Sequence, residues 1–93
     1  MTDYIASAEK LAKRIYPLTV VMDRYNGTYS GGKWVAFNLE PDEVPEDAQG
    51  DDVACCVFYS ENRVRHGVGG SVYEAIIDLY TRMSDEELLP EKW

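Results

Sequence analysis

The sequence predicts an α+β fold: a three- to four-stranded antiparallel sheet with N-terminal and C-terminal helices packed on one face. Apolar residues recur at helical spacing near both ends of the chain, and short runs rich in branched and aromatic residues lie between them. Asn-Gly and Gly-Gly pairs lie between the first two of these runs. Since 93 residues have room for one core, we expect residues 1–93 to form a single α+β domain.

The first expected element is an N-terminal helix. Tyr4, Ala8, Leu11 and Ile15 follow the spacing of one helix face. Pro17 ends this helix, because the residue before a proline is disfavoured in the α region.

Three strands are expected next, each in a run of apolar, branched or aromatic residues. They cover residues 18–25 (LTVVMDRY), 34–39 (WVAFNL) and 53–59 (VACCVFY), and residues 63–66 either extend the third strand or form a short fourth. A long acidic loop separates the second strand from the third, with one helical turn beginning at Pro41 or Pro45.

The C-terminal helix has the clearest signal and is predicted from about Val72 to Met83. Ser71 followed by Glu74 is a capping box, and the stripe after it is apolar. A second box, Ser84 with Glu87, predicts a short last turn.

Cys55 and Cys56 are adjacent, and in a strand they would point to opposite faces. We interpret them as two reduced thiols of a cytoplasmic protein, and a vicinal disulfide switch or a thiolate metal site is the alternative. No apolar run approaches 18 residues and the N-terminus lacks the pattern of a signal peptide, so no membrane contact is expected. No cofactor, metal site or catalytic group is predicted.

The net charge of −8 is concentrated in one part of the chain. Eight acids and no Lys or Arg lie between residues 38 and 62, while the rest holds nine acids and nine bases. Direct nucleic-acid binding is disfavoured there, because phosphate contacts need cations, and a basic protein partner is favoured. The candidate partner-binding acids are Glu40, Asp42, Glu43, Glu46, Asp47, Asp51 and Asp52.

The stretch DRYNGTYSGGKW, residues 23–34, holds more than a tight hairpin needs. Asn-Gly alone can form the turn, so Gly31 and Gly32 either bend the second strand or let another backbone approach closely. Tyr25, Tyr29 and Trp34 would then surround a spot floored by glycine and act as an aromatic contact patch beside the acids. The alternative is that these rings pack on one another and on the sheet.

A candidate anion site lies in NRVRHGVGGS, where cations precede a capped helix start. The alternative is a plain turn and helix cap, with both arginines paired to the acidic loop and the one histidine at the surface. The residues of this candidate site are Arg63, Arg65, His66, Gly69, Gly70 and Ser71.

Residues 20–79 resemble small proteins encoded by phages and other mobile elements, which share a RYxGxYSGGK segment, an acidic Pro-containing loop and a Gly-rich entry into a final helix. Small acidic proteins from such elements include anti-CRISPR and other anti-defence inhibitors, so the resemblance implies that context. The final GxGGSxxEAIxxL is also similar to the strand-to-helix junction of HicB-type antitoxins.

The resulting hypothesis is a non-enzymatic, anti-CRISPR-like inhibitor. Its acids would mimic the phosphates of DNA and occupy the basic nucleic-acid groove of a host nuclease complex. The alternative is a small-ligand or nucleotide-sequestering protein that uses Arg63, Arg65 and the Gly-rich helix entry. A toxin–antitoxin partner is a third class that would use the same acidic face.

Overall fold

A computed structural model describes residues 8–61 and 64–89, and it confirms the predicted α+β class. Residues 8–12 are helical. The later elements are β1 (Thr19–Met22), β2 (Trp34–Phe37), the 3₁₀ turns η1 (Pro41–Glu43) and η2 (Glu46–Gln49), α2 (Asp52–Ser60), β3 (His66–Gly69), α3 (Val72–Arg82) and η3 (Asp85–Glu87).

The three strands form one antiparallel sheet in the order β1-β2-β3. On central β2, Val21 of β1 pairs with Val35, and Val35 pairs with Val68 of β3. Side chains alternate between the two faces of the sheet, so consecutive β2 residues enter different cores.

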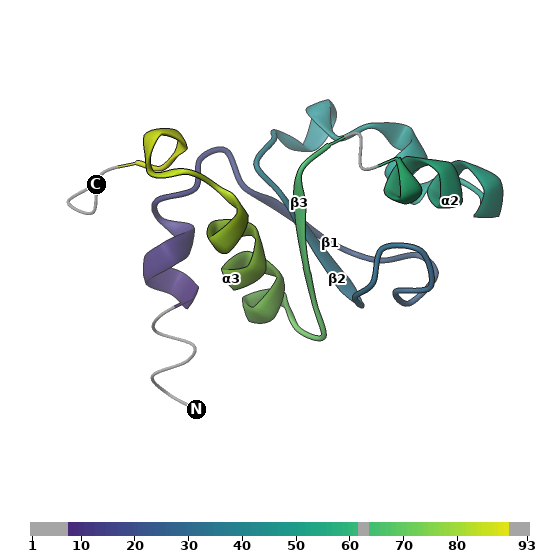
Figure 1. Ribbon diagram of the computed structural model, residues 1–93, viewed down its shortest axis with the longest axis horizontal. Coiled ribbons are helices and arrows are strands. Elements are labelled where there is room, and N and C mark those ends of the chain that lie inside the picture. The colour runs from purple at the N-terminus through teal and green to yellow at the C-terminus, as the bar shows by residue number, and fades with distance from the viewer. Residues whose placement is uncertain (1–7, 62–63, 90–93) are drawn as a thin grey trace.

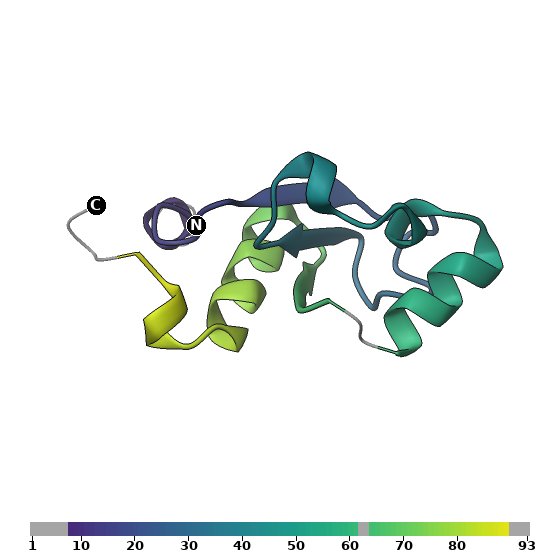
Figure 2. The ribbon, with the colours of Figure 1, turned by 90° about the horizontal axis from the view of Figure 1, so that it is seen from above.

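The α3-side core holds the contacts between the helices at the two ends of the chain. Its buried residues are Ile15, Ala36, Ala75, Ile76, Leu79 and Met83. Figures 1 and 2 show the N-terminal helical segment beside α3 on this face. Arg14 joins the ends further, since its Nε donates to the Leu89 carbonyl at 2.9 Å and Nη1 to the Tyr80 hydroxyl at 2.8 Å.

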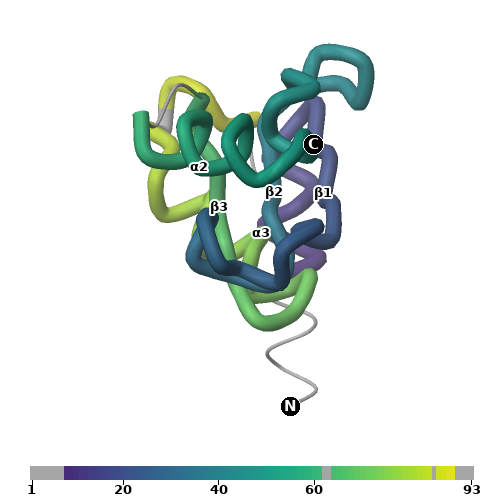
Figure 3. Tube along the Cα trace, turned by 90° about the vertical axis from the view of Figure 1, so that its right-hand side faces the viewer, coloured from purple at the N-terminus to yellow at the C-terminus, as the bar shows by residue number. Residues whose placement is uncertain are grey.

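The opposite face is covered by a helix that the sequence did not predict. Phe58 and Tyr59 of α2 pack on Val35 and Phe37 of β2, together with Ala48 and Cys55, and we call this cluster the α2-side core. Figure 3 looks onto α2 with the strands behind it. The sheet is therefore the middle of three layers.

The predicted strand at 53–59 is wrong. Asp51 caps α2, because its Oδ1 accepts a hydrogen bond from the Ala54 N–H at 2.9 Å, and residues 52–60 are helical. The third strand is His66–Gly69 instead, so the predicted strand at 63–66 overlaps it only at His66. Arg63 lies outside the described residues.

Glycine sets the distance between β3 and α3. A Cβ built on Gly67 would lie 2.6 Å from Leu79 Cα, and one on Gly69 would lie 2.6 Å from Ala75 N. The two backbones meet with no side chain between them, and the Ser71–Glu74 box fixes the helix start, where the Glu74 N–H donates to Ser71 Oγ at 3.2 Å.

The remaining predicted elements agree with the structure. At the second predicted capping box the Ser84 N–H donates to Glu87 Oε1 at 2.8 Å at the start of η3, which is one of the two hydrogen bonds of such a box. Both prolines of the acidic loop begin turns, Pro41 as the first residue of η1 and Pro45 as the cap of η2, where one turn was expected.

Candidate protein-binding surface

The connection between β1 and β2 is organised around the buried side chain of Asp23. Asp23 Oδ2 accepts hydrogen bonds from the Gly27 N–H and the Ser30 hydroxyl, and the Asp23 N–H donates to the Lys33 carbonyl at 2.7 Å. Asp23 is 5% exposed, and its Oδ1 is buried without a hydrogen-bond partner in the described part of the chain. This segment, residues 23–33, is a folded loop rather than a two-residue turn.

Of the two predicted purposes of these glycines, the close approach of another backbone is found at Gly32, while Gly31 adopts a positive φ. Asn26, Gly27 and Gly31 have φ values of 56°, 91° and 97°, in the region that favours glycine and tolerates asparagine. Gly32 is the point of close approach, because a Cβ there would lie 2.6 Å from the backbone nitrogen of Gly69 in β3.

Two of the three predicted contact aromatics lie together. The rings of Tyr25 and Tyr29 meet edge to face with centroids 5.5 Å apart, and both pack against the α2-side core. Trp34 packs against the α3-side core on the other face of the sheet, because it alternates with Val35. The structure therefore does not bring Trp34 into a common patch with the tyrosines.

Both tyrosine hydroxyls reach the acidic segment, which we define as residues 40–52. Tyr25 donates to the Gly50 carbonyl at 3.3 Å, and Tyr29 donates to Asp52 Oδ1 at 3.1 Å. The hydrogen bond to the Asp52 carboxylate raises the pKa of Tyr29, and burial raises the pKa of Tyr25. Both hydroxyls thus remain donors at neutral pH.

Arg24 and Gln49 attach the same segment to the sheet. Arg24 Nη1 donates to the Gly50 carbonyl at 2.9 Å, and its guanidinium lies 5.3 Å from the centroid of the Tyr25 ring. Gln49 Nε2 donates to the Met22 carbonyl at 2.8 Å, and Gln49 Oε1 accepts from the Arg24 N–H at 3.2 Å. The acidic segment is therefore anchored along its second half.

Five of the seven candidate acids fall into two groups. The side chains of three acids accept hydrogen bonds within the protein. Glu43 Oε1 accepts from the Glu40 N–H at 2.8 Å, Asp51 Oδ1 from the Ala54 N–H, and Asp52 Oδ1 from the Tyr29 hydroxyl. Asp42 and Glu46 are exposed and make no side-chain hydrogen bond or ion pair in the described chain. All seven lie on the segment that runs from the end of β2 to the start of α2 (Figure 1).

The candidate anion site is not assembled among its described members. Arg65 forms a bidentate ion pair with Glu87, with Nη1 2.7 Å from Oε1, so it does not pair with the acidic loop. This arginine, with the Ser84 N–H, lowers the pKa of Glu87 to about 2. Arg65 is therefore engaged by a carboxylate already.

The other members of that site have structural roles. His66 is buried rather than at the surface, with Nδ1 2.9 Å from the Val64 carbonyl oxygen and its ring 5.1 Å from that of Tyr59. Gly69 lies directly against the backbone of α3, and the Ser71 hydroxyl caps the N-terminus of that helix. Gly70 is exposed and lies next to the Glu74 side chain.

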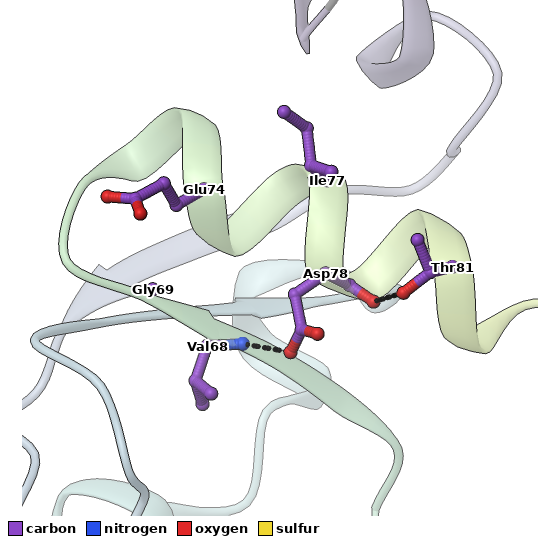
Figure 4. A pocket seen from close by; sticks show the side chains of 6 residues that line it. All are labelled: Val68, Gly69, Glu74, Ile77, Asp78 and Thr81. Atoms are coloured by element: carbon purple, nitrogen blue, oxygen red, sulfur yellow. Dashed lines mark hydrogen bonds between the residues drawn. The ribbon is translucent and has the colours of Figure 1, made fainter.

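A shallow hollow lies beside this helix entry, between β3 and α3 (Figure 4). Asp78 crosses it, with Oδ2 accepting from the Val68 N–H at 2.8 Å and the backbone carbonyl accepting from the Thr81 hydroxyl at 2.7 Å. Glu74 lines its other side. Two carboxylates make this hollow unfavourable for a phosphate.

The cysteines lie on α2 and face different environments. Cys55 is buried with Sγ 3.4 Å from the carbonyl oxygens of Ala48 and Gly50, and burial raises the pKa of its thiol. Cys56 is exposed on the outer surface of α2. No cluster of three or more His, Cys, Asp or Glu suited to a metal ion occurs in residues 8–61 and 64–89.

None of the helices in the described ranges has the length and apolar character needed to span a bilayer. Comparison of the chain with protein families, with curated proteins and with solved structures finds no match.

Proposed function

We propose that this protein is a non-enzymatic inhibitor of the anti-CRISPR type, which binds a basic, nucleic-acid-binding surface of a host nuclease complex. Carboxylates of the acidic segment would occupy the positions that phosphates take in that groove. The nucleic acid would then be excluded by competition, with no chemical step.

The observation that carries this proposal is the anchoring of the acidic segment. Arg24, Tyr25 and Tyr29 hold the second half of the segment by hydrogen bonds to the Gly50 carbonyl and to Asp52, so the backbone there does not have to be ordered when a partner binds. A preorganised surface loses less conformational entropy on association than a solvated loop does.

The local charge favours a basic partner. Seven carboxylates lie in residues 40–52 with no Lys or Arg between Lys33 and Arg63, and Arg24 contacts the segment at the Gly50 carbonyl. Such a field steers a cationic partner and raises the association rate by tenfold or more at low salt.

The alternative, a protein that sequesters a nucleotide, has less support. It uses Arg63 and Arg65 for the phosphate; Arg65 already pairs with Glu87, and Arg63 lies outside the described residues. Carboxylates of Glu74 and Asp78 line the hollow at the helix entry.

The proposal is tested by competition for DNA. A purified CRISPR nuclease complex is bound to fluorescently labelled target DNA, and the protein is titrated in while anisotropy is recorded. We expect the DNA to be displaced, and we expect no change when the protein is added to labelled DNA alone. Displacement should weaken as salt rises toward about 0.5 M, since the Debye length shortens.

A matched pair of variants makes the test specific. Asp42→Asn with Glu46→Gln removes two charges from the acidic segment, and Glu9→Gln with Glu86→Gln removes two exposed charges elsewhere. At about 0.2–1 kcal/mol for each exposed pair, the first variant should displace DNA about 2- to 30-fold less well, and the second should resemble the wild type. Equal loss in both variants, or no displacement by the wild type across a panel of nuclease complexes, would overturn the proposal.

A further inference from the structure

The outward face of α2 is apolar although it is exposed. Val53, Cys56, Val57 and Ser60 are spaced i, i+3, i+4 and i+7, so they form one stripe along the helix. Val53 is 73% exposed and Val57 is 37% exposed. We call this stripe the α2 outer face, and Figure 3 looks onto α2, the helix that carries it.

A surface helix of a monomer normally has polar residues on its outer face. The inner face of α2 already buries Cys55, Phe58 and Tyr59, so the helix is apolar on both sides. A helix with apolar residues on both its inner and outer sides is typical of a buried position, and Val53 and Val57 lie side by side on the outer one.

From this face and its charge we infer that α2 docks a Lys- and Arg-rich amphipathic helix of a partner protein, with the α2 outer face as the apolar centre of the contact. Small side chains such as Val, Cys and Ser let a second helix approach closely. The inference deepens the proposed function and rests on it, because it adds an apolar anchor to the acidic surface.

Charge decides between a basic partner and a second copy of this chain. Asp51 and Asp52 are exposed at the start of α2, and Glu46 and Asp47 precede them in η2. Two copies packed through α2 would place two acidic surfaces against each other, each copy carrying a net charge of −8. Lysines of a basic partner helix, flanking its own apolar stripe, would instead form ion pairs with the acids at the start of α2.

Two synthetic peptides of about five helical turns provide the probe. One has Lys and Leu arranged so that the leucines form a single helix face, and the other has the same composition in scrambled order without such a face. Affinity is measured by fluorescence anisotropy of the labelled peptides. In parallel, the rate at which iodoacetamide alkylates Cys56 is followed by mass spectrometry.

We expect the patterned peptide to bind at least about tenfold tighter than the scrambled one, because it covers two valines that are otherwise in water. It should also slow alkylation of Cys56. Val53→Ser with Val57→Ser should remove the advantage of the patterned peptide. Met22→Ser should preserve it, since Met22 is also exposed but alternates with Val21 and so points to the other face of the sheet.

Equal affinity of the two peptides, or unchanged Cys56 alkylation at saturation, would overturn the inference. So would a dimer in sedimentation analysis that Val53→Ser with Val57→Ser dissociates, because a second copy would then cover the face. The variant Asp42→Asn with Glu46→Gln distinguishes failure of the proposed function from failure of this inference. If this variant binds both peptides as tightly as the wild type does, the proposed charge mimicry fails. If the patterned peptide still binds more tightly than the scrambled one, the apolar contact stands. Circular dichroism and urea titration verify that each variant is folded.

Discussion

Replacing Gly67 by Ala tests the packing that joins α3 to the sheet. The added Cβ would lie 2.6 Å from Leu79 Cα and closer still to the Leu79 nitrogen and the Ala75 oxygen. These are backbone atoms, so no change of rotamer relieves the contact. Ordinary van der Waals separation begins at 3.4 Å, and α3 therefore has to retreat by about 0.8 Å or more.

Moving α3 away from the sheet lowers the free energy of unfolding by an amount that its packing indicates. Ala75 and Leu79 are fully buried against the sheet, and a gap of 0.5–1 Å forfeits about a quarter to a half of each dispersion contact. Overpacking in well-packed cores costs about 1–3 kcal/mol, and the rigid surroundings here indicate the upper end, about 3 kcal/mol. A chain of this length has a total stability of only about 5–14 kcal/mol.

The measurement is urea unfolding followed by circular dichroism. With an m value of about 1 kcal/mol/M, the midpoint of Gly67→Ala should fall by about 3 M. Gly70→Ala is the control, because a Cβ on exposed Gly70 would meet only the end of the Glu74 side chain, at 3.3 Å. Midpoints of the two variants within about 0.5 M of each other would refute the description of the β3–α3 contact.

Three further results are expected. Leu79→Ala should lower the free energy of unfolding by about 2–4 kcal/mol, because Leu79 is fully buried in the α3-side core. An unchanged melting temperature would refute that placement. A thiol reagent should modify Cys56 in the folded protein but Cys55 only in urea, and equal reactivity of the two thiols would contradict the burial of Cys55. A reductant should leave the circular dichroism spectrum unchanged. Arg65 lowers the pKa of Glu87 from 4.5 to about 2, so this pair adds stability above about pH 4.5 that is lost as pH falls toward about 2. Stability curves of the wild type and Arg65→Gln should therefore differ at neutral pH and converge near pH 2, and a constant difference down to pH 2 would contradict the ion pair.

The elements with a single apolar face were predictable from the sequence. The stripe of α3 has the expected geometry, and each flanking Ser–Glu pair makes one of the two hydrogen bonds of a capping box, through Ser71 Oγ and through the Ser84 N–H. Strands β1 and β2 lie inside their predicted ranges because each is a short run of branched or aromatic residues.

The third strand was not predictable from the same rules. β3 consists of His66, Gly67, Val68 and Gly69, and glycine is depleted in strands. The reason for these glycines is tertiary, since α3 approaches β3 too closely for a side chain. A pattern rule that sees only local propensity places a turn there.

The charge of the acidic segment could be predicted from the sequence, but its contacts with the rest of the protein could not. The excess of acids in residues 38–62 is a matter of composition. Its attachment depends on Arg24 and Tyr25 reaching carbonyl groups 25 or 26 residues away, and carbonyl groups carry no sequence signal. The exclusion of Trp34 follows from strand alternation once the bounds of β2 are known.

The outer valines of α2 both hide the helix in the sequence and give it an exposed apolar face. Helical periodicity is visible in a sequence when a polar face alternates with an apolar one, and here Val53, Cys56 and Val57 replace that polar face. The inner positions 55, 58 and 59 have helical spacing, and Asp51 is a capping residue, but the outer valines hide this pattern behind a run with high β propensity. Selection for solubility alone would put Lys or Glu at these outer positions, where they would also favour the helix. Apolar residues retained there, beside a surface otherwise dense in carboxylates, are accounted for if a partner covers them.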